Sequence, residues 1–274
     1  MKKILTTLAL GISLLTGAQA NTCGIVIDFP PGGTSDAYVR AMQKNNPDIQ
    51  IEYKTGGFGA NAINLLNQDK NFIFFTSPGM YGSTSPIKDP PLELLRIIVG
   101  APILALTNKP LNFDSLLKGK VNIGVPALNT SHHMVALQLK SVNPNIEVIP
   151  TGGDNKALPM VKNGDLDLYL VSATAGTKWV PDFGFSNVFT LFFNKPLTKS
   201  GVTLHAAGFN GAFVHRDATP EQRIKALDCI SKAVDQPSWK ETLINMGAQP
   251  IDLVGPEKDK AFANYLRLMK KEGL

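Results

Sequence analysis

The chain has 274 residues, a formal net charge of +5 and 43% hydrophobic residues, which is enough for one large domain or two lobes. No basic run is interleaved with aromatic residues, so nucleic acid is not an expected partner. Beyond the first residues no apolar stretch has the length of a bilayer span, so we expect the mature protein to be soluble.

Residues 1–20 have the features of a secretory signal peptide. Two lysines precede an apolar run over residues 4–15, and the small-x-small sequence Ala18-Gln19-Ala20 is typical of a cleavage site. The apolar run is too short to cross a membrane comfortably. We therefore predict a periplasmic protein whose mature chain begins near Asn21, with an uncleaved anchor as the alternative.

Apolar strands alternate with helical segments in the first part of the mature chain. The patterns predict strands over 24–29, 49–53 and 72–75, and helices over 35–44 and 61–67. The order strand-helix-strand-helix-strand predicts a parallel, doubly wound sheet.

A second α/β set follows an apolar stretch over 97–106 that could carry the chain out of the first lobe. We expect strands over 121–125, 147–149 and 166–171, and helices over 132–140 and 157–162. After residues 209–215 the pattern turns helical, with helices from residue 219, over 239–246 and over 257–271. The simplest arrangement is two α/β lobes, each a mainly parallel sheet flanked by helices. Residues 21–105 plus 209–274 form lobe 1, and residues 106–208 form lobe 2.

The chain has two cysteines, Cys23 and Cys229. In an exported protein an even pair is a disulfide candidate, provided that a C-terminal helix packs beside the first strand. Two unpaired thiols are the alternative.

The stretch "DFPPGGTSDAYVR", residues 28–40, joins the first predicted strand to the first helix. Gly32 and Gly33 would let the backbone come close to a ligand, and Thr34 or Ser35 could cap a helix whose free N–H groups attract an anion. The spacing fits neither G-x-x-x-x-G-K-[ST] nor G-x-G-x-x-G, so a nucleotide-phosphate loop is not predicted. A tight turn without a ligand is the alternative.

Similar small, polar loops follow the other predicted strands. They are residues 55–61 and Thr76-Ser77-Pro78-Gly79 in the first lobe, and residues 126–133, 151–154 and 172–174 in the second. Ligands in open α/β sheets bind at the carboxyl ends of strands. We therefore expect these loops to form the two walls of one cleft.

No metal, cofactor or catalytic centre is predicted. His132 and His133 are adjacent, so their side chains point to different faces of a helix, and no Cys/His/Asp/Glu cluster has the spacing of a metal site. There is no G-x-S-x-G elbow and no nucleophile spaced with Asp36, which disfavours an exported hydrolase. Asp36 is expected to tie down its own loop or to contact the ligand, and Arg40 to pair with Asp36.

The stretch "FPPGGTSDAYVR" is similar to the P-F-x-x-G-G-x-x-D-x-x-A-R signature of the substrate-binding proteins of tripartite tricarboxylate transporters, the Bug-type extracytoplasmic solute receptors. Asp28 stands where the signature has its proline. The resemblance continues in order over nearly all of the mature chain, through "KTGGFGANAINLL", "GVPALNTSHHMVALQLKS", "IPTGGDNKALPMVKNGDLDLYLVSA" and "ATPEQRIKALDCISKAVDQPSWKETLINMGAQP".

This resemblance implies a two-lobed periplasmic binding protein, a Venus flytrap of type II-like topology, and not an enzyme. Such receptors capture a small carboxylate, often a dicarboxylate, through main-chain amides and hydroxyls, and pass it to a membrane permease. The implied ligand-binding residues are Pro31, Gly32, Gly33, Thr34, Asp36, Thr76, Ser77, Thr130, Ser131, His132, Gly152, Gly153 and Asp154. A monomer is expected. Another solute, such as an amino acid or an aromatic acid, or a role as ligand sensor for a membrane signalling protein, is the alternative.

Overall fold

The computed structural model describes residues 22–83, 85–206 and 208–274. The predicted signal peptide therefore lies outside the described residues. Within the described residues, no helix combines the length and the apolar character needed to cross a membrane.

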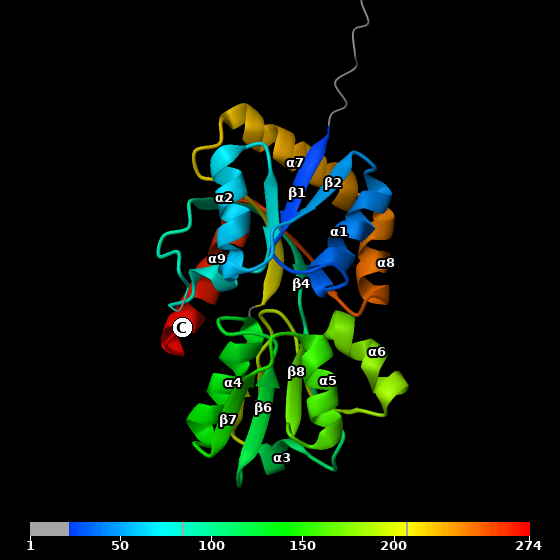
Figure 1. The fold of residues 1–274 in the computed structure, drawn as a ribbon, viewed down its shortest axis with the longest axis vertical. Coiled ribbons are helices and arrows are strands. Elements are labelled where there is room, and N and C mark those ends of the chain that lie inside the picture. Colours follow the sequence, from blue (N-terminus) through cyan, green and yellow to red (C-terminus); the bar gives the residue numbers. More distant parts are fainter. Residues whose placement is uncertain (1–21, 84, 207) are drawn as a thin grey trace, which may run out of the picture.

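The strands form two main sheets, one above the other in Figure 1. The first has the order β13-β4-β12-β3-β1-β2, with bounds Gln249–Leu253, Leu92–Gly100, Phe209–His215, Ile73–Thr76, Cys23–Ile27 and Ile49–Tyr53. The second has the order β7-β6-β8-β5-β9, with bounds Ile146–Pro150, Val121–Val125, Leu168–Ser172, Ile103–Thr107 and Ser186–Leu191. A small hairpin, β10 (Leu197–Lys199) and β11 (Val202–Leu204), accompanies the second sheet.

The predicted two-lobed α/β fold is confirmed, with one qualification about strand direction. The pairs β1–β2, β1–β3, β6–β7 and β6–β8 are parallel, as expected. The pairs that involve β4, β5 and β12 are antiparallel. Both sheets are therefore mixed and not mainly parallel as expected, because the strands that enter and leave the second lobe run against their neighbours.

Helices cover both faces of each sheet, and the alternation of side chains along the strands explains why. In β1, Ile25 and Ile27 pack on one face with α1 (Thr34–Asn45), α7 (Pro220–Val234) and α8 (Pro237–Asn245). Val26, between them, packs on the other face with α2 (Ala60–Gln68) and α9 (Gly255–Lys271). Successive strand residues point to opposite faces, so a continuous apolar run indicates a sheet covered on both sides.

The second sheet follows the same rule. Ile103 and Ala105 of β5 pack with α3 (Phe113–Leu116) and α4 (Ser131–Val142). Leu104 and Leu106 face α5 (Asp154–Asn163) and α6 (Ala173–Phe183). Two short 3-10 helices, η1 (Gly57–Gly59) and η2 (Pro78–Tyr81), complete the loops of the first lobe.

The chain crosses between the lobes twice, near residues 101 and 208, and the two crossing segments lie side by side. The apolar stretch 97–106 is not one element, because β4 ends at Gly100 and β5 begins at Ile103. Pro102, between them, has no N–H to continue a ladder. The Ala101 N–H donates a hydrogen bond to the Gly208 carbonyl (3.1 Å), which links the two crossings. The expected boundary at residue 105 falls inside β5, which pairs with β8 and β9 of the second sheet.

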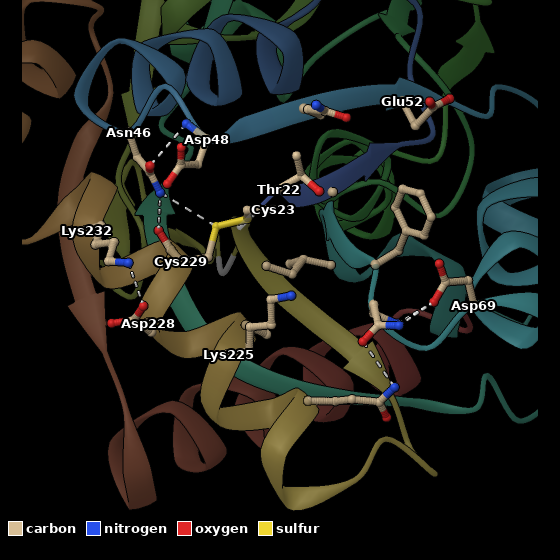
Figure 2. Close-up of a pocket in the computed structure, with 17 residues that line it drawn as sticks. Thr22, Cys23, Asn46, Asp48, Glu52, Asp69, Lys225, Asp228, Cys229 and Lys232 are labelled. Carbon is tan, nitrogen blue, oxygen red and sulfur yellow. Dashed lines mark hydrogen bonds and ion pairs between the residues drawn. A yellow bond between two sulfur atoms is a disulfide. The ribbon is translucent and has the colours of Figure 1, made fainter. Parts of the chain in front are cut away.

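The predicted disulfide is confirmed. Cys23 in β1 and Cys229 in α7 are bonded, with their Cα atoms 6.2 Å apart (Figure 2). Both cysteines are buried in the core between the first sheet and α7.

Candidate functional site

The carboxyl ends of β1, β2 and β3 face those of β6, β7 and β8 across the junction of the lobes (Figure 1). Helices α1, α2, α4, α5 and α6 begin near this junction. The first amides of a helix have no intrahelical partner and form its positive end. The predicted side-chain cap of α1 is wrong, because Gly33 occupies the N-cap position and no side chain caps the helix.

The two lobes are joined by hydrogen bonds between hydroxyl groups. The Thr34 Oγ1 and Ser172 Oγ atoms lie 2.8 Å apart, and one helical turn further the Tyr38 Oη and Thr174 Oγ1 atoms lie 2.6 Å apart. Because these residues stand at or near the starts of α1 and α6, the positive ends of the two helices face each other. The structure therefore shows the lobes closed together.

Glycines allow the loops of the two lobes to approach closely around Asn129. This residue is fully buried and has a left-handed backbone, with φ = 58°. A Cβ atom on Gly82 would lie 2.4 Å from Asn129 Cγ, and one on Gly79 would lie 3.0 Å from the Asn129 carbonyl oxygen. A Cβ on Gly208 would likewise lie 2.4 Å from Ser131 Oγ. A larger residue at any of these glycines would push against the start of α4.

Buried polar atoms without a partner gather at the start of α4. Within the described residues there are five buried side-chain N or O atoms without a hydrogen bond, and four of them belong to Asn129 and His132. An unsatisfied buried donor or acceptor costs about 1–3 kcal/mol, so a bound molecule that supplies partners here is favoured. Burial lowers the pKa of His132 to about 4. The imidazole is therefore neutral at pH 7 and offers one N–H donor.

Asp36 organises its own loop, which is one of the two roles predicted for it. It accepts hydrogen bonds from the Gly32 amide (2.7 Å), from Arg40 Nε (3.0 Å) and from the Tyr53 hydroxyl (2.5 Å). Burial opposes ionisation, but the bonds from Tyr53, Gly32 and Arg40 hold the pKa of Asp36 below its usual range. The predicted Asp36–Arg40 pair is confirmed. The Gly32 amide is thus already occupied.

The first loop needs a glycine at only one of its two glycine positions. Gly32 has φ = 85°, which favours glycine, whereas Gly33 has φ = −79°. The Gly33 amide donates to the Pro30 carbonyl (3.4 Å), and a Cβ on Gly33 would meet that oxygen at 3.4 Å, an ordinary contact. Pro31 is exposed on the same loop.

In the second lobe, the glycine loop before α5 does have the backbone that glycine favours. Gly152 and Gly153 have φ = 75° and φ = 123°. Asp154, which follows them, accepts a hydrogen bond from the Tyr169 hydroxyl (2.6 Å), and burial raises its pKa. Thr130 caps α4 by accepting from the His133 amide (3.2 Å). Gly152, Gly153, Asp154 and Thr130 therefore shape the loops around the junction.

Several residues at the junction were not predicted as ligand-binding residues, namely Asp28, Tyr38, Asn129, Ser172 and Thr174. The i, i+4 spacing of the hydroxyls of Thr34 and Tyr38 could have indicated that both lie on one face of α1. Asn129 directly precedes the capping threonine, a place where asparagine readily adopts a left-handed conformation. No local pattern indicated that Thr174 would meet Tyr38.

Asp28 carries a testable electrostatic signature. Burial raises its pKa from 3.8 to about 6, against the lowering effect of the Thr76 hydroxyl. Between those values the folded protein binds more protons than the unfolded chain, so the stabilising contribution of Asp28 is lost as pH rises from about 4 to 6. Asp28→Asn should therefore gain stability relative to the parent protein between pH 4 and 7, by roughly 2–3 kcal/mol. Urea unfolding at the two pH values measures this gain, and equal differences at both would contradict it.

Two hollows lie away from the carboxyl ends of the strands. One, of about 160 Å³, opens at the amino ends of β1, β2 and β3 beside the disulfide (Figure 2). Its lining holds the acids Asp48, Glu52, Asp69 and Asp228, but only the bases Lys225 and Lys232. Ligand pockets usually measure about 300–1,000 Å³, so this cavity is small for a solute and has the wrong charge for an anion.

The second hollow, of about 740 Å³, is a groove between α9 and the segment around residues 194–206. Its size would suit a ligand, and it carries Lys260 and Arg267. None of the buried, unpartnered side-chain atoms of the described residues lies there. The region between the lobes at the carboxyl ends of the strands, where Asn129 and His132 lie, is therefore a better candidate site than this groove.

Comparison with solved structures finds periplasmic binding proteins. A TctC solute-binding protein from Polaromonas shares 14% identity at a TM-score of 0.63, over 91% of this chain and 98% of the other. An R. palustris protein solved with adipate shares 17% identity at a TM-score of 0.77 (92% and 97%). MatC from Rhodopseudomonas palustris, solved with malate, shares 17% at 0.69 (92% and 96%).

No protein-family model matches the chain, and no curated protein matches its sequence. The structural likeness covers nearly all of the described residues and both sheets, at identities that establish architecture alone. The chain therefore has the two-lobed fold of periplasmic solute-binding proteins, with TctC-type receptors among its structural neighbours.

Proposed function

We propose that this protein is a distant TctC- or Bug-type receptor that captures a small carboxylate between its lobes in the periplasm. The observation that carries the proposal is the set of buried, unpartnered polar atoms of Asn129 and His132 at the junction of the lobes. A ligand held there would supply their missing partners. In this proposal the receptor is a binder and not an enzyme, and it delivers its ligand to the permease of a tripartite transporter.

Neutral donors would hold the carboxylate. The positive ends of α1 and α6 face each other, and the hydroxyls of Thr34 and Ser172 lie between them. A neutral His132 adds an N–H donor. Arg40, a basic side chain of α1, is already bound to Asp36 and Tyr53. Helix N-termini are common sites for anions, so an arginine is not required.

The hydrolase alternative finds no support at the junction. In the described part of the chain, no histidine is hydrogen-bonded to a serine hydroxyl. Ser131 lies against Gly208, and its neighbour His132 has no partner on either ring nitrogen. A nucleophile activated by a base needs such a contact. A binder for another solute, or a sensor for a membrane signalling protein, uses the same architecture and stays the alternative.

A thermal-shift screen of the mature protein, refolded to remove any co-purified ligand, tests the carboxylate proposal. Each carboxylic acid in the panel, amino acids included, is paired with its amide, and sugars serve as controls. A ligand at about 100 times its Kd should add roughly 2.7 kcal/mol to the free energy of unfolding. We expect dose-dependent shifts with acids and not with amides. No shift with any acid would refute the proposal.

A gene deletion in cells distinguishes a role in transport from a role in sensing. Deleting the gene should abolish uptake of the identified ligand if the receptor serves a permease. If uptake persists while a ligand-dependent transcriptional response is lost, the partner is a sensor.

Gly82→Ala should weaken ligand binding by obstructing closure. The added Cβ would meet Asn129 Cγ at 2.4 Å, which forces the lobes apart at this contact. We expect a loss of about tenfold or more in affinity, equivalent to about 1.4 kcal/mol, in isothermal titration calorimetry. The matched control is Gly124→Ala, whose Cβ would meet Leu166 at 2.5 Å inside lobe 2. The control should lose stability and keep its affinity; equal affinity losses in both variants would contradict a role in closure.

A further inference from the structure

Asp28 lies where three loops of lobe 1 meet, at the carboxyl end of β1. Its Oδ1 atom accepts a hydrogen bond from the Thr76 hydroxyl (2.9 Å), at the end of β3. Its Oδ2 atom would lie 3.5 Å from a Cβ on Gly59, the residue that precedes α2. Gly59 has φ = 87°, so a backbone that favours glycine brings this loop against the carboxyl group. No other described residue donates a hydrogen bond to Oδ2.

No cation of the described residues compensates Asp28. Asp28 takes part in none of the ion pairs of the described residues. Burial raises its pKa, and the Thr76 hydroxyl and its own backbone lower it. In α1, Arg40 is engaged by Asp36 and Tyr53. After β2, the Lys54 amide donates a hydrogen bond to the Ile27 carbonyl, and Lys54 is in none of the ion pairs of the described residues. The remaining neighbours, Thr76 and Gly59, carry no charge.

This arrangement conflicts with a ligand that is only an anion. Helix N-termini at the junction favour a carboxylate, whereas a desolvated acid at the end of β1 repels a second negative group. Like charges about 4 Å apart repel each other, and burial strengthens the effect. A ligand with an ammonium group beside its carboxylate removes the conflict. The ammonium would donate to Asp28 Oδ2, and the carboxylate would meet the amides and hydroxyls at the start of α1.

We propose that Asp28 is a specificity-determining residue that selects a zwitterion, that is, a free amino acid, over the corresponding simple carboxylic acid. This inference rests on the proposed carboxylate site and narrows its ligand class. A charge-assisted hydrogen bond to a partly buried carboxylate corresponds to a preference of about 10- to 100-fold.

The test uses ligand pairs that share a carbon skeleton and differ in the amino group. Aspartate is compared with succinate, glutamate with glutarate, alanine with propionate, and phenylalanine with 3-phenylpropionate, by calorimetry at pH 7.5. Malate, which has a hydroxyl where aspartate has its ammonium, separates charge from hydrogen bonding. For at least one pair we expect the amino acid to bind tenfold or more tightly than its partner.

Asp28→Asn supplies the decisive variant because it keeps the shape and removes the charge. The preference for the amino acid should collapse to within about threefold. Asp28→Ser repeats the test with a smaller side chain in case the asparagine variant folds poorly. Asp48→Asn, just before β2 and so at the amino ends of the strands, is the matched control and should keep the parent preference.

Each outcome has a distinct meaning. Tighter binding of simple acids, or an amino-acid preference that survives in both Asp28 variants, would overturn the role of Asp28 and leave the carboxylate receptor standing. If no member of any pair binds, the proposed carboxylate site is refuted, and the selection by Asp28 is refuted with it. Loss of the preference in the Asp28 variants alone supports the inference.

Discussion

The double variant Cys23→Ser, Cys229→Ala should have a free energy of unfolding about 2–5 kcal/mol lower than that of the parent protein. The bond joins residues 206 positions apart, so it restricts the unfolded chain over most of its length. Stabilisation of this kind grows with the size of the closed loop, although measured values often fall below the ideal. In the folded protein the bond fastens β1 to α7 through two buried side chains.

Urea unfolding of the double variant, and of the parent protein with and without reductant, measures this effect. The disulfide lies at the amino ends of the strands, whereas the proposed site lies at their carboxyl ends. Ligand affinity of the folded variant should therefore match that of the parent protein. Equal stability of the oxidised parent and the double variant would show that the bond contributes nothing. A loss of affinity at equal foldedness would show coupling between the two ends of lobe 1.

The second large effect concerns Arg96, a buried arginine in the middle of β4. Its guanidinium contacts both carboxylate oxygens of Asp252 (2.6 Å each), Asp235 (2.5 Å) and the Ser231 hydroxyl (2.9 Å). Only 6% of its side chain is exposed, against 54% for Asp235 and 58% for Asp252. The buried partner and the exposed partners should therefore respond differently to mutation.

Changing Asp235 and Asp252 together to asparagine should cost about 3–5 kcal/mol, because a buried cation loses its counter-charges. Arg96→Met should cost less, since an apolar side chain fills the space and the two aspartates can be hydrated at the surface. Thermal and urea unfolding of the two variants give the order. Arg96→Met could instead lower the free energy of unfolding more than the double aspartate change does. That result would show that the hydrogen bonds of the guanidinium outweigh the cost of burying its charge.

Helices and strands with a strong hydrophobic periodicity were predicted from the sequence, and those without it were missed. The strand over 121–125 has the observed bounds, and the helix over 35–44 lies within α1, because a clear apolar pattern sits between loops rich in glycine and polar residues. Helix α6 was not predicted, since Gly176 and Pro181 weaken its helical pattern. The edge strand β13 contains Pro250, so it lacks a strand signature.

The site was predictable where it depends on local geometry. Asp36 and Arg40 are one helical turn apart, and their pairing follows from that spacing. The contact between Tyr38 and Thr174 joins residues 136 positions apart and depends on how the lobes close. The state of Asp28 depends on β3 and on the loop before α2, neither of which its neighbours in the sequence reveal.

The contacts that hold the lobes together also determine how the conformational equilibrium responds to the medium. The hydrogen bonds Thr34–Ser172 and Tyr38–Thr174 are formed by neutral hydroxyls, and every ion pair of the described residues lies within one lobe. Neutral contacts are little affected by screening, whereas exposed charge pairs weaken as salt rises. Closure should therefore proceed almost equally at low and high ionic strength, so that of the two steps only the proposed capture of a charged ligand should depend on the salt concentration.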